Sequence, residues 1–211
     1  MTRCVIFDVD GTIFDTGEGI RYCARLALDE LGARDFPDSK LNMFIGPSLF
    51  YSFNTIVGLD EETAMRGVEL YRARYKTEGI EMSRPYGGMD KLLMRLKNDG
   101  FIITIASSKP ISMVNYLLGK FDMAKYFEEV VAADFATVSS DKSDFIKKAS
   151  KGDDNIMVGD THFDIEGAHK AGVKVIAAAY GFGERSTLEG AEYIADSVED
   201  VYTAVKKYFD K

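Results

Sequence analysis

The segment Cys4-Val5-Ile6-Phe7-Asp8-Val9-Asp10-Gly11-Thr12 stands near the start of the chain and decides its fold. Four apolar residues come first, and such a run is typical of a short strand buried on both faces of a parallel sheet. Two acids separated by one residue follow the run, and Gly11 allows a sharp turn of the backbone behind them. The segment therefore predicts a buried strand that delivers carboxylates to the edge of a sheet.

Three further apolar runs of strand length follow, at residues 101–106, 155–159 and 173–178. Apolar residues recur at helical spacing over residues 89–97, 143–148, 164–171 and 197–208. An alternation of buried strands and amphipathic helices predicts an α/β fold, a Rossmann-like core with a doubly wound parallel sheet.

A stretch of about seventy residues interrupts that alternation, because residues 16 to 84 show helical patterns only, at roughly 18–31, 47–57 and 61–79. We expect its aromatic residues to form a core of their own: Phe44, Phe50, Tyr51 and Phe53. Pro85 and the glycines after it mark the return to alternating strands and helices. We therefore predict a core domain of residues 1–15 and 85–211 and an inserted all-α cap domain of residues 16–84.

The composition bounds the partners and the compartment of the chain. Its 211 residues carry a formal net charge of −8, which argues against nucleic acid or an anionic membrane surface as a partner. No apolar run approaches the roughly 20 residues of a membrane span, and the N-terminus lacks the pattern of a signal peptide. We read Cys4 and Cys23 as reduced, buried thiols of a cytoplasmic protein. The oligomeric state stays open between monomer and homodimer.

Reactive side chains follow several of the predicted strands. At or near the strand ends the chain places carboxylates, hydroxyls and lysines: Asp8, Asp10, Ser107, Ser108, Lys109, Lys142, Asp160 and Asp164. Because ligands of open parallel sheets bind at the carboxyl ends of the strands, we expect these groups to meet at one edge.

This set of groups suits a divalent cation and a phosphoryl group. Mg²⁺ prefers hard oxygen ligands and binds through few carboxylates, such as those of Asp8 and Asp160. A carboxylate can also act as a nucleophile and form an aspartyl-phosphate, provided that cations offset the repulsion between the two anions. A second acid two residues away, Asp10, can protonate the leaving oxygen and then deprotonate water. The residues therefore predict a magnesium-dependent site for phosphoryl transfer.

The segment from Phe7 to Thr12, followed by Ile13-Phe14-Asp15-Thr16, resembles the first signature of the haloacid dehalogenase superfamily. Ser107 matches the second signature, Lys142 the third, and Gly159-Asp160-Thr161-His162-Phe163-Asp164 the fourth, in the same order. The helical insert resembles the C1 cap of that superfamily. Two positions depart from the pattern: no Pro follows Lys142, and Ser108 stands where many relatives carry Asn.

The resemblance implies a role for each matching position. Asp8 would be the nucleophile and a magnesium ligand. Asp10 would be the general acid/base and would offer its main-chain carbonyl to the metal. Ser107 would bind a phosphoryl oxygen. Lys142 would hold the charges of nucleophile and phosphate together. Asp160 would bind the metal, assisted by Asp164 directly or through water.

The acid at Asp10 favours phosphatases and mutases within the superfamily, since dehalogenases lack it and P-type ATPases carry Thr there. Mutases of this cap type usually have a His early in the cap, where this chain reads Gly17-Glu18-Gly19-Ile20, so a β-phosphoglucomutase-like transfer is disfavoured. The segments 44–49 and 107–110 resemble the phosphoglycolate phosphatase and 5′-nucleotidase-like branch. The resemblance implies hydrolysis of phosphoglycolate or, alternatively, of a nucleoside 5′-monophosphate.

Several assignments have alternatives. The candidate substrate contacts are Gly11, Thr12, Gly46, Ser108 and Lys109. Lys109 fits a solvent-exposed lysine equally well, and Asp164 also fits a helix cap. The Gly181-Phe182-Gly183 segment follows a strand but lacks the third glycine of a dinucleotide-binding loop, so we expect no such function there.

A second class of protein uses similar residue types. Phospho-receiver modules combine a parallel sheet, clustered acids, a lysine and an aspartyl-phosphate without acting as phosphatases. They have no cap, and their phosphorylated acid follows a later strand. The place of Asp8 after the first strand and the insert at 16–84 therefore favour an enzyme over such a regulator.

Overall fold

The computed structural model describes residues 1–134 and 141–210. The chain divides into two compact units, one formed by Met1–Asp15 and Pro85–Lys211 and the other by Thr16–Arg84. We call them the α/β unit and the helical unit. The chain passes between the units at two short strands, β2 (Phe14–Asp15) and β3 (Arg84–Pro85).

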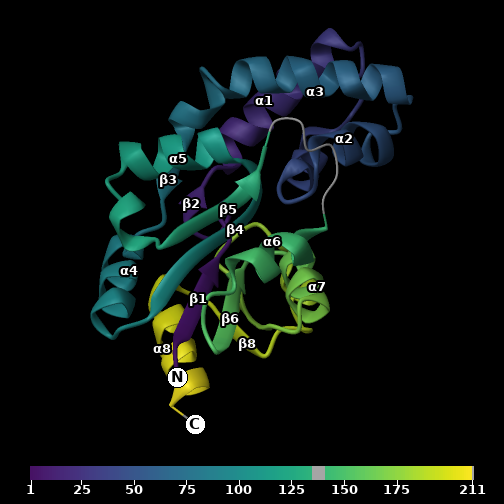
Figure 1. Ribbon diagram of the computed structural model, residues 1–211. Helices are drawn as coiled ribbons and strands as arrows, with labels where there is room; N and C mark the ends of the chain where they lie inside the picture. Colours follow the sequence, from purple (N-terminus) through teal and green to yellow (C-terminus); the bar gives the residue numbers. More distant parts are fainter. Residues whose placement is uncertain (135–140, 211) are drawn as a thin grey trace. The chain divides into compact units, whose positions relative to one another are not determined.

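The α/β unit is built on a six-stranded sheet in which all neighbouring strands are parallel, in the order β5-β4-β1-β6-β7-β8 (Figure 1). The strands are β1 (Arg3–Phe7), β4 (Ile102–Pro110), β5 (Glu129–Ala133), β6 (Asp154–Gly159), β7 (Lys174–Ala178) and β8 (Tyr193–Ala195). In the register of β1, Phe7 lies beside Ile105 of β4 and Val158 of β6. This central position explains why the strand is apolar and buried from Cys4 to Phe7.

Helices cover both faces of this sheet: α4 (Met89–Asn98), α5 (Ile111–Lys120), α6 (Lys142–Ala149), α7 (His162–Lys170) and α8 (Val198–Phe209). Ile146 of α6 and Ile165 of α7 share one hydrophobic cluster with Ile6 of β1. Because successive side chains of a strand point to opposite faces, Val5 and Phe7 are buried on the other face. Covering both faces is what the apolar strands require.

The predicted fold class is confirmed, and the four predicted strands correspond to β1, β4, β6 and β7. The sequence pattern misses β5, β8 and α5. Strand β5 begins with Glu129 and lies at the end of the sheet, and β8 has only three residues. Neither strand offers the long apolar run on which the prediction rests.

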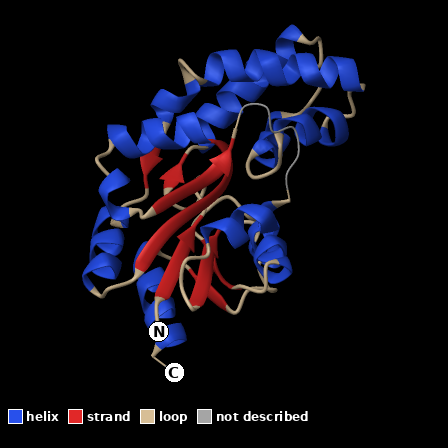
Figure 2. Ribbon diagram, in the orientation of Figure 1, coloured by secondary structure: helices blue, strands red, loops and turns tan. Residues whose placement is uncertain are grey.

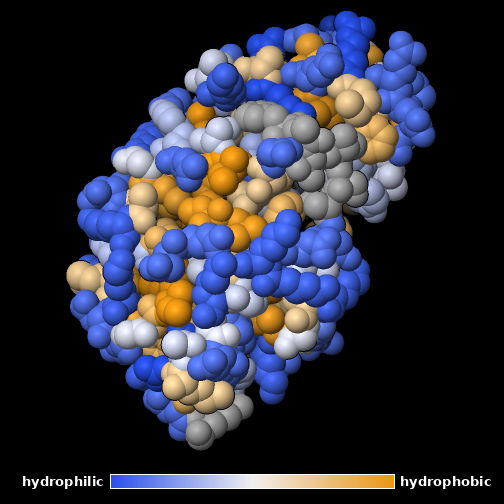
Figure 3. All heavy atoms as spheres, in the orientation of Figure 1, coloured by the Kyte–Doolittle hydropathy of each residue, from blue (hydrophilic) through white to orange (hydrophobic). Residues whose placement is uncertain are grey.

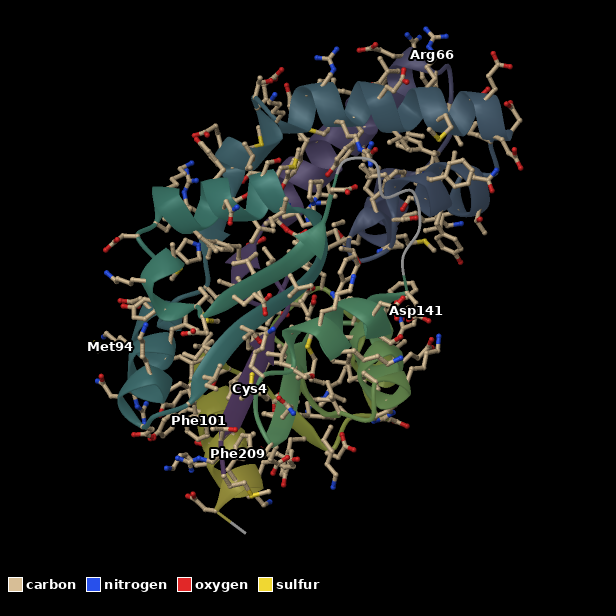
Figure 4. The ribbon with its side chains drawn as sticks, in the orientation of Figure 1. Cys4, Arg66, Met94, Phe101, Asp141 and Phe209 are labelled. Carbon is tan, nitrogen blue, oxygen red and sulfur yellow. The ribbon has the colours of Figure 1, made fainter. Side chains whose placement is uncertain are left out.

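The last helix of the α/β unit is held by aromatic and polar contacts. The ring of Phe209 in α8 lies 5.2 Å from the ring of Phe101, which precedes β4 (Figure 4). The hydroxyl of Tyr202 donates to Asp99 Oδ2 at 2.8 Å, and Arg95 of α4 pairs with Glu199 at 2.7 Å. These contacts fix the end of the chain to the sheet and lie away from the carboxyl ends of the strands.

The helical unit contains helices and turns, as its sequence pattern predicts (Figure 2). Its elements are α1 (Gly17–Glu30), η1 (Asp38–Phe44), α2 (Leu49–Tyr51), η2 (Ser52–Ile56), α3 (Glu61–Tyr75) and η3 (Gly79–Met82). Of these, η1 and η3 are 3₁₀ turns and η2 is a π turn. The predicted helix at 47–57 is therefore a short α-turn followed by a π turn, and it begins at Leu49 behind the side-chain cap of Ser48.

The core of the helical unit is aromatic, but not with all of the predicted residues. Phe44 and Phe53 are buried with their rings edge to face at 5.1 Å. Phe50 is half-buried, and the prediction is wrong for Tyr51, which is 45% exposed. Residues two apart on a helix point to nearly opposite sides, so the ring of Phe53 is buried while that of Tyr51 is not.

The face seen in Figure 3 is mostly hydrophilic, with apolar residues gathered over the β5 end of the sheet. Among the strands that the structure describes, β5 pairs with β4 alone, and Val130 and Val131 are half-buried there. Cys4 and Cys23 are both buried and free. In the part of the chain that the structure describes, we find no helix with the length and apolarity of a membrane span.

Candidate active site

The predicted reactive residues of the α/β unit lie at the carboxyl edge of its sheet. Asp8 follows β1 directly, and Asp160 follows β6. Ser107 lies on β4, which is the other neighbour of β1. Since these three strands are adjacent and parallel, their ends bring the three side chains to the same edge.

Three carboxylates form a buried cluster at this edge. Asp8, Asp160 and Asp164 each offer an oxygen within 4.8 Å of the others, and all three residues are at most 5% exposed. Lys142 Nζ lies 2.7 Å from Asp8 Oδ1 and 2.9 Å from Asp164 Oδ1. The ammonium therefore bridges two of the three acids.

The position of Lys142 follows from local structure. It is the first residue of α6, behind the side-chain cap of Asp141, which accepts a hydrogen bond from Ser143 N at 3.0 Å (Figure 4). A Cβ atom on Gly167 of α7 would come within 2.8 Å of Lys142 Cβ, so the glycine makes room for the lysine. The competing lysines of this region are exposed: Lys147, Lys148 and Lys151.

Burial and mutual repulsion alter the ionisation of the cluster. Burial raises the pKa of Asp8 to about 6, with Asp164 adding to the rise and Lys142 opposing it. Burial and the charges of Asp164 and Asp8 also raise the pKa of Asp160. Burial would lower the pKa of Lys142, but the two carboxylates outweigh it and raise that pKa. Lys142 therefore stays charged, and its single positive charge does not balance the three carboxylates.

The cluster fits a divalent cation. When all groups are ionised, the three carboxylates and the ammonium leave two uncompensated negative charges in a buried space. Such a deficit is costly in a protein interior unless a cation offsets it. The donors are hard carboxylate oxygens, which Mg²⁺ and Ca²⁺ prefer. The donor set and its charge therefore both match a bound divalent metal.

Asp164 serves two structural positions at once. Its Oδ2 accepts hydrogen bonds from the amide and the hydroxyl of Thr161, at 3.0 and 2.8 Å, which completes a capping box at the start of α7. Its Oδ1 faces Lys142. The helix-cap and metal-site alternatives for Asp164 are thus compatible, since the cap uses Oδ2 and leaves Oδ1 beside Lys142. His162, beside it, is exposed.

Asp10 lies outside this carboxylate cluster and pairs with a different lysine. Lys109 Nζ lies 2.9 and 3.3 Å from the two oxygens of Asp10. The side chain of Lys109 is only 4% exposed, so the solvent-exposed alternative for this residue is wrong. The amide of Lys109 donates to Ser107 Oγ at 3.3 Å. Asp10 is therefore an acid outside the cluster of Asp8, Asp160 and Asp164, and its carboxyl group could transfer a proton.

Two predicted substrate contacts instead face Asp160. Gly11 has a φ of +77°, and a Cβ atom there would lie 2.0 Å from Asp160 Oδ2. Thr12 is fully buried and its hydroxyl donates to Asp160 Oδ1 at 3.4 Å. The glycine is therefore required for close approach to a carboxylate, and the Thr12 side chain is buried against that same carboxylate.

The remaining predicted substrate residues belong to different units. Ser108 is half-buried on β4 beside Ser107. Gly46 belongs to the helical unit, where it connects η1 to α2 with a φ of +104°.

Sequence reasoning misses two contacts of this site. The backbone amide of Phe182 donates to Asp160 Oδ2 at 2.8 Å, and the hydroxyl of Tyr180 donates to the carbonyl oxygen of Thr12 at 3.0 Å. Both residues follow β7, the strand next to β6. Their place after a strand of the same sheet is the one available signal, and the Gly181-Phe182-Gly183 segment marks it.

Fold and site together define an α/β protein with a buried acid cluster, which could hold a cation, at the carboxyl edge of its sheet. The comparison with protein families agrees with this class. The model described as haloacid dehalogenase-like hydrolase matches residues 5–178, and the chain belongs to that family.

Individual relatives cover nearly the whole chain. A protein of Pseudomonas aeruginosa named 5′-nucleotidase is 32% identical over 201 residues, which span 91% of this chain and 90% of the relative. One of Vibrio parahaemolyticus named phosphoglycolate phosphatase is 27% identical, over 96% of each chain. A solved structure from Clostridium acetobutylicum, titled as a predicted phosphatase, is 35% identical with a TM-score of 0.92, over 98% of this chain and 99% of that one.

Proposed function

We propose that this protein is a magnesium-dependent phosphatase that hydrolyses a small-molecule phosphate monoester through an aspartyl-phosphate on Asp8. The observation that carries the proposal is the position of Asp8, within 2.7 Å of Lys142 and inside a cluster of three buried carboxylates. Family membership and the names of the relatives support the phosphatase class.

Two displacements at phosphorus make up the reaction. A carboxylate oxygen of Asp8 attacks the phosphorus atom, the bond from phosphorus to the ester oxygen breaks, and Asp10 donates a proton to the departing alkoxide. Water then attacks the same phosphorus atom while Asp10 accepts its proton. The bond between phosphorus and Asp8 breaks, which releases inorganic phosphate and restores both carboxyl groups.

Positive charge makes the first attack feasible, because nucleophile and substrate are both anions. Lys142 sits beside Asp8 and would hold a phosphoryl oxygen near it, and the Ser107 hydroxyl would donate a second hydrogen bond. Asp8, Asp160 and the Asp10 carbonyl would hold Mg²⁺, with Asp164 assisting. When bound, this ion supplies charge neutralisation and orientation of the phosphoryl group.

Lys109 has a separate task in this scheme. Its ammonium contacts both oxygens of Asp10, so it orients the carboxylate that must exchange a proton with the leaving group and with water. The Lys109 side chain of this ion pair is shielded from solvent, which strengthens the attraction between Lys109 and Asp10.

The helical unit would act as the cap that selects the ester and excludes bulk water. Phosphoglycolate is the leading substrate, and a nucleoside 5′-monophosphate is the alternative, which the name of the Pseudomonas relative supports. A mutase activity of the β-phosphoglucomutase type is disfavoured, because residues 17–20 contain no His. The free, buried thiols of Cys4 and Cys23 agree with a cytoplasmic location.

The test is a comparison of kcat/KM across phosphoglycolate, nucleoside 5′-monophosphates and sugar phosphates, with Mg²⁺ and with EDTA. We expect release of phosphate with Mg²⁺, its loss with EDTA, and a clear preference for one of the first two classes. Purified protein that releases no phosphate from any ester of the panel would remove the enzyme assignment. Hydrolysis that persists in EDTA would remove the metal dependence.

A further inference from the structure

The segment that follows β7, residues 180–183, reads Tyr-Gly-Phe-Gly and has no assigned role. We infer that this segment, which we call the β7 loop, positions the metal ligand Asp160 and thereby sets the affinity of the site for a divalent cation. The inference rests on the metal site of the proposed function, and it adds a determinant of that site outside the four signatures.

The first support is a direct hydrogen bond to the ligand. The amide of Phe182 donates to Asp160 Oδ2 at 2.8 Å, while the Thr12 hydroxyl donates to Oδ1 at 3.4 Å. With both donors in place the carboxylate of Asp160 is held in one rotamer. Hydrogen-bonded partners of metal ligands orient them and raise metal affinity.

The second support is steric. A Cβ atom on Gly183 would lie 2.0 Å from the backbone oxygen of Asp160, and one on Gly181 would lie 2.4 Å from both Asp160 Cβ and the backbone oxygen of Gly11. Backbone atoms cannot yield as a side-chain tip can. The β7 loop therefore approaches Asp160 as closely as a main chain can, and only glycine permits this at 181 and 183.

The third support is a link from the loop to the first signature. The hydroxyl of Tyr180 donates to the carbonyl oxygen of Thr12 at 3.0 Å, and the ring of Tyr180 packs edge to face on Tyr86 at 4.9 Å. Thr12 in turn contacts Asp160. The β7 loop thus joins the segment behind Asp8 to Asp160, so one loop fixes the spacing of two proposed metal ligands.

The same contacts explain why the glycines stand where they do without a bound dinucleotide. The Phe182 amide could otherwise donate a hydrogen bond to a phosphate, but it already donates to Asp160. The loop is directed at a protein carboxylate, and the glycines serve the approach of one backbone segment to another.

The test measures the affinity for Mg²⁺ itself, without substrate. Melting temperature is followed as a function of Mg²⁺ concentration for wild type, Gly183→Ala, Tyr180→Phe and Gly119→Ala. Stabilisation by a ligand grows as RT ln(1 + [Mg²⁺]/Kd), so the Mg²⁺ concentration at which the melting temperature begins to rise reports the apparent Kd separately from the baseline stability of each variant. Gly119 is the matched control, since a Cβ atom there meets nothing within 4 Å.

We expect Gly183→Ala to raise the apparent Kd about 10- to 100-fold, as loss of a ligand's hydrogen-bond partner typically does. Tyr180→Phe removes one hydroxyl and should raise it about fivefold, the equivalent of one hydrogen bond. Gly119→Ala should bind like wild type. If Gly183→Ala does not fold, Tyr180→Phe decides the question on its own.

Folded variants of the β7 loop that bind Mg²⁺ as tightly as wild type would overturn the inference and leave the proposed function standing. Wild-type protein whose melting temperature ignores Mg²⁺ would overturn both the inference and the metal site. If wild type binds Mg²⁺, the variants bind it more weakly, and no phosphate ester is hydrolysed, the inference holds and the proposed function fails.

Discussion

The two units of this chain bury different kinds of polar residue. Among the residues placed by the structure, all of the buried charged residues belong to the α/β unit: Asp8, Lys109, Asp160 and Asp164. Apart from tyrosines, the buried polar side chains of the helical unit are hydroxyls only: Thr16, Ser52 and Ser83. One unit therefore holds buried charge, and the other holds an aromatic core.

The difference separates chemistry from scaffolding. Burying an ion costs several kcal/mol unless it is paired, so four buried charges at one sheet edge are an expensive arrangement for stability alone. The helical unit avoids that cost and packs rings such as Phe44 and Phe53 instead. The contrast predicts that substitutions in the α/β cluster alter catalysis and metal binding, and that substitutions in the helical core alter stability.

Replacement of the nucleophile should have the largest effect. Asp8→Asn keeps the shape of the side chain but removes its negative charge, so we expect kcat to fall by roughly 10⁴-fold or more while the fold survives. Steady-state kinetics and circular dichroism measure the two properties. Asp144→Asn, on the exposed surface of α6, is the matched control and should keep wild-type activity. A wild-type rate in Asp8→Asn would exclude this residue as the nucleophile.

The proton-transfer role of Asp10 predicts a smaller, substrate-dependent effect. Asp10→Asn should lower kcat by about 10²- to 10⁴-fold for alkyl phosphates. The loss in the first step should be less for an aryl ester such as p-nitrophenyl phosphate, whose leaving group needs no proton. Single-turnover rates of phosphorylation on both esters test this expectation. An equal loss on both would argue that Asp10 acts by position or charge alone.

The helical core offers the opposite test. Phe53→Ala removes a fully buried ring and should lower the free energy of unfolding by about 3–5 kcal/mol. Urea denaturation measures this change, and the folded variant should keep the wild-type Kd for Mg²⁺. Tyr51→Ala is the control, because its 45% exposed ring should contribute within about 0.5 kcal/mol. A weakened Mg²⁺ affinity in Phe53→Ala would break the separation between the two units.

Lowering the pH should weaken Mg²⁺ binding, and we expect this effect to be the smallest of the four. The pKa of Asp8 is raised to about 6 without the metal, so the carboxyl becomes neutral as the pH falls through that value. Because Mg²⁺ binds the charged form, its apparent Kd should rise about tenfold per pH unit below the pKa for each carboxyl that is protonated. Mg²⁺ titrations of the melting temperature at pH 5 and pH 7.5 compare the two forms. Equal affinity at both would contradict the burial-raised pKa.

The sequence predicts the central part of the fold well, because β1, β4, β6 and β7 are continuous apolar runs. It misses β5, since an edge strand needs no such run. The three acids of the cluster and Lys142 could be named in advance, because each directly follows a strand or lies in the first turn of a helix.

Other features of the site depend on tertiary contacts and carry no local signal. The pairing of Lys109 with Asp10 joins residues 99 positions apart. Gly11 could be expected at a close approach, but its partner is the Asp160 carboxylate, which only the packing of β1 beside β6 determines. The Phe182 amide is a backbone group, so no side-chain pattern reveals its use.

The aspartyl-phosphate on Asp8 is the central claim, and chemical trapping tests it most directly. Protein quenched during turnover is treated with borohydride, which reduces an aspartyl-phosphate to homoserine, and tandem mass spectrometry then locates the homoserine. The account predicts homoserine at position 8, present with Mg²⁺ and substrate and absent with EDTA. Homoserine at the position of another aspartate would contradict it. So would protein that turns over substrate but yields no homoserine after the borohydride treatment.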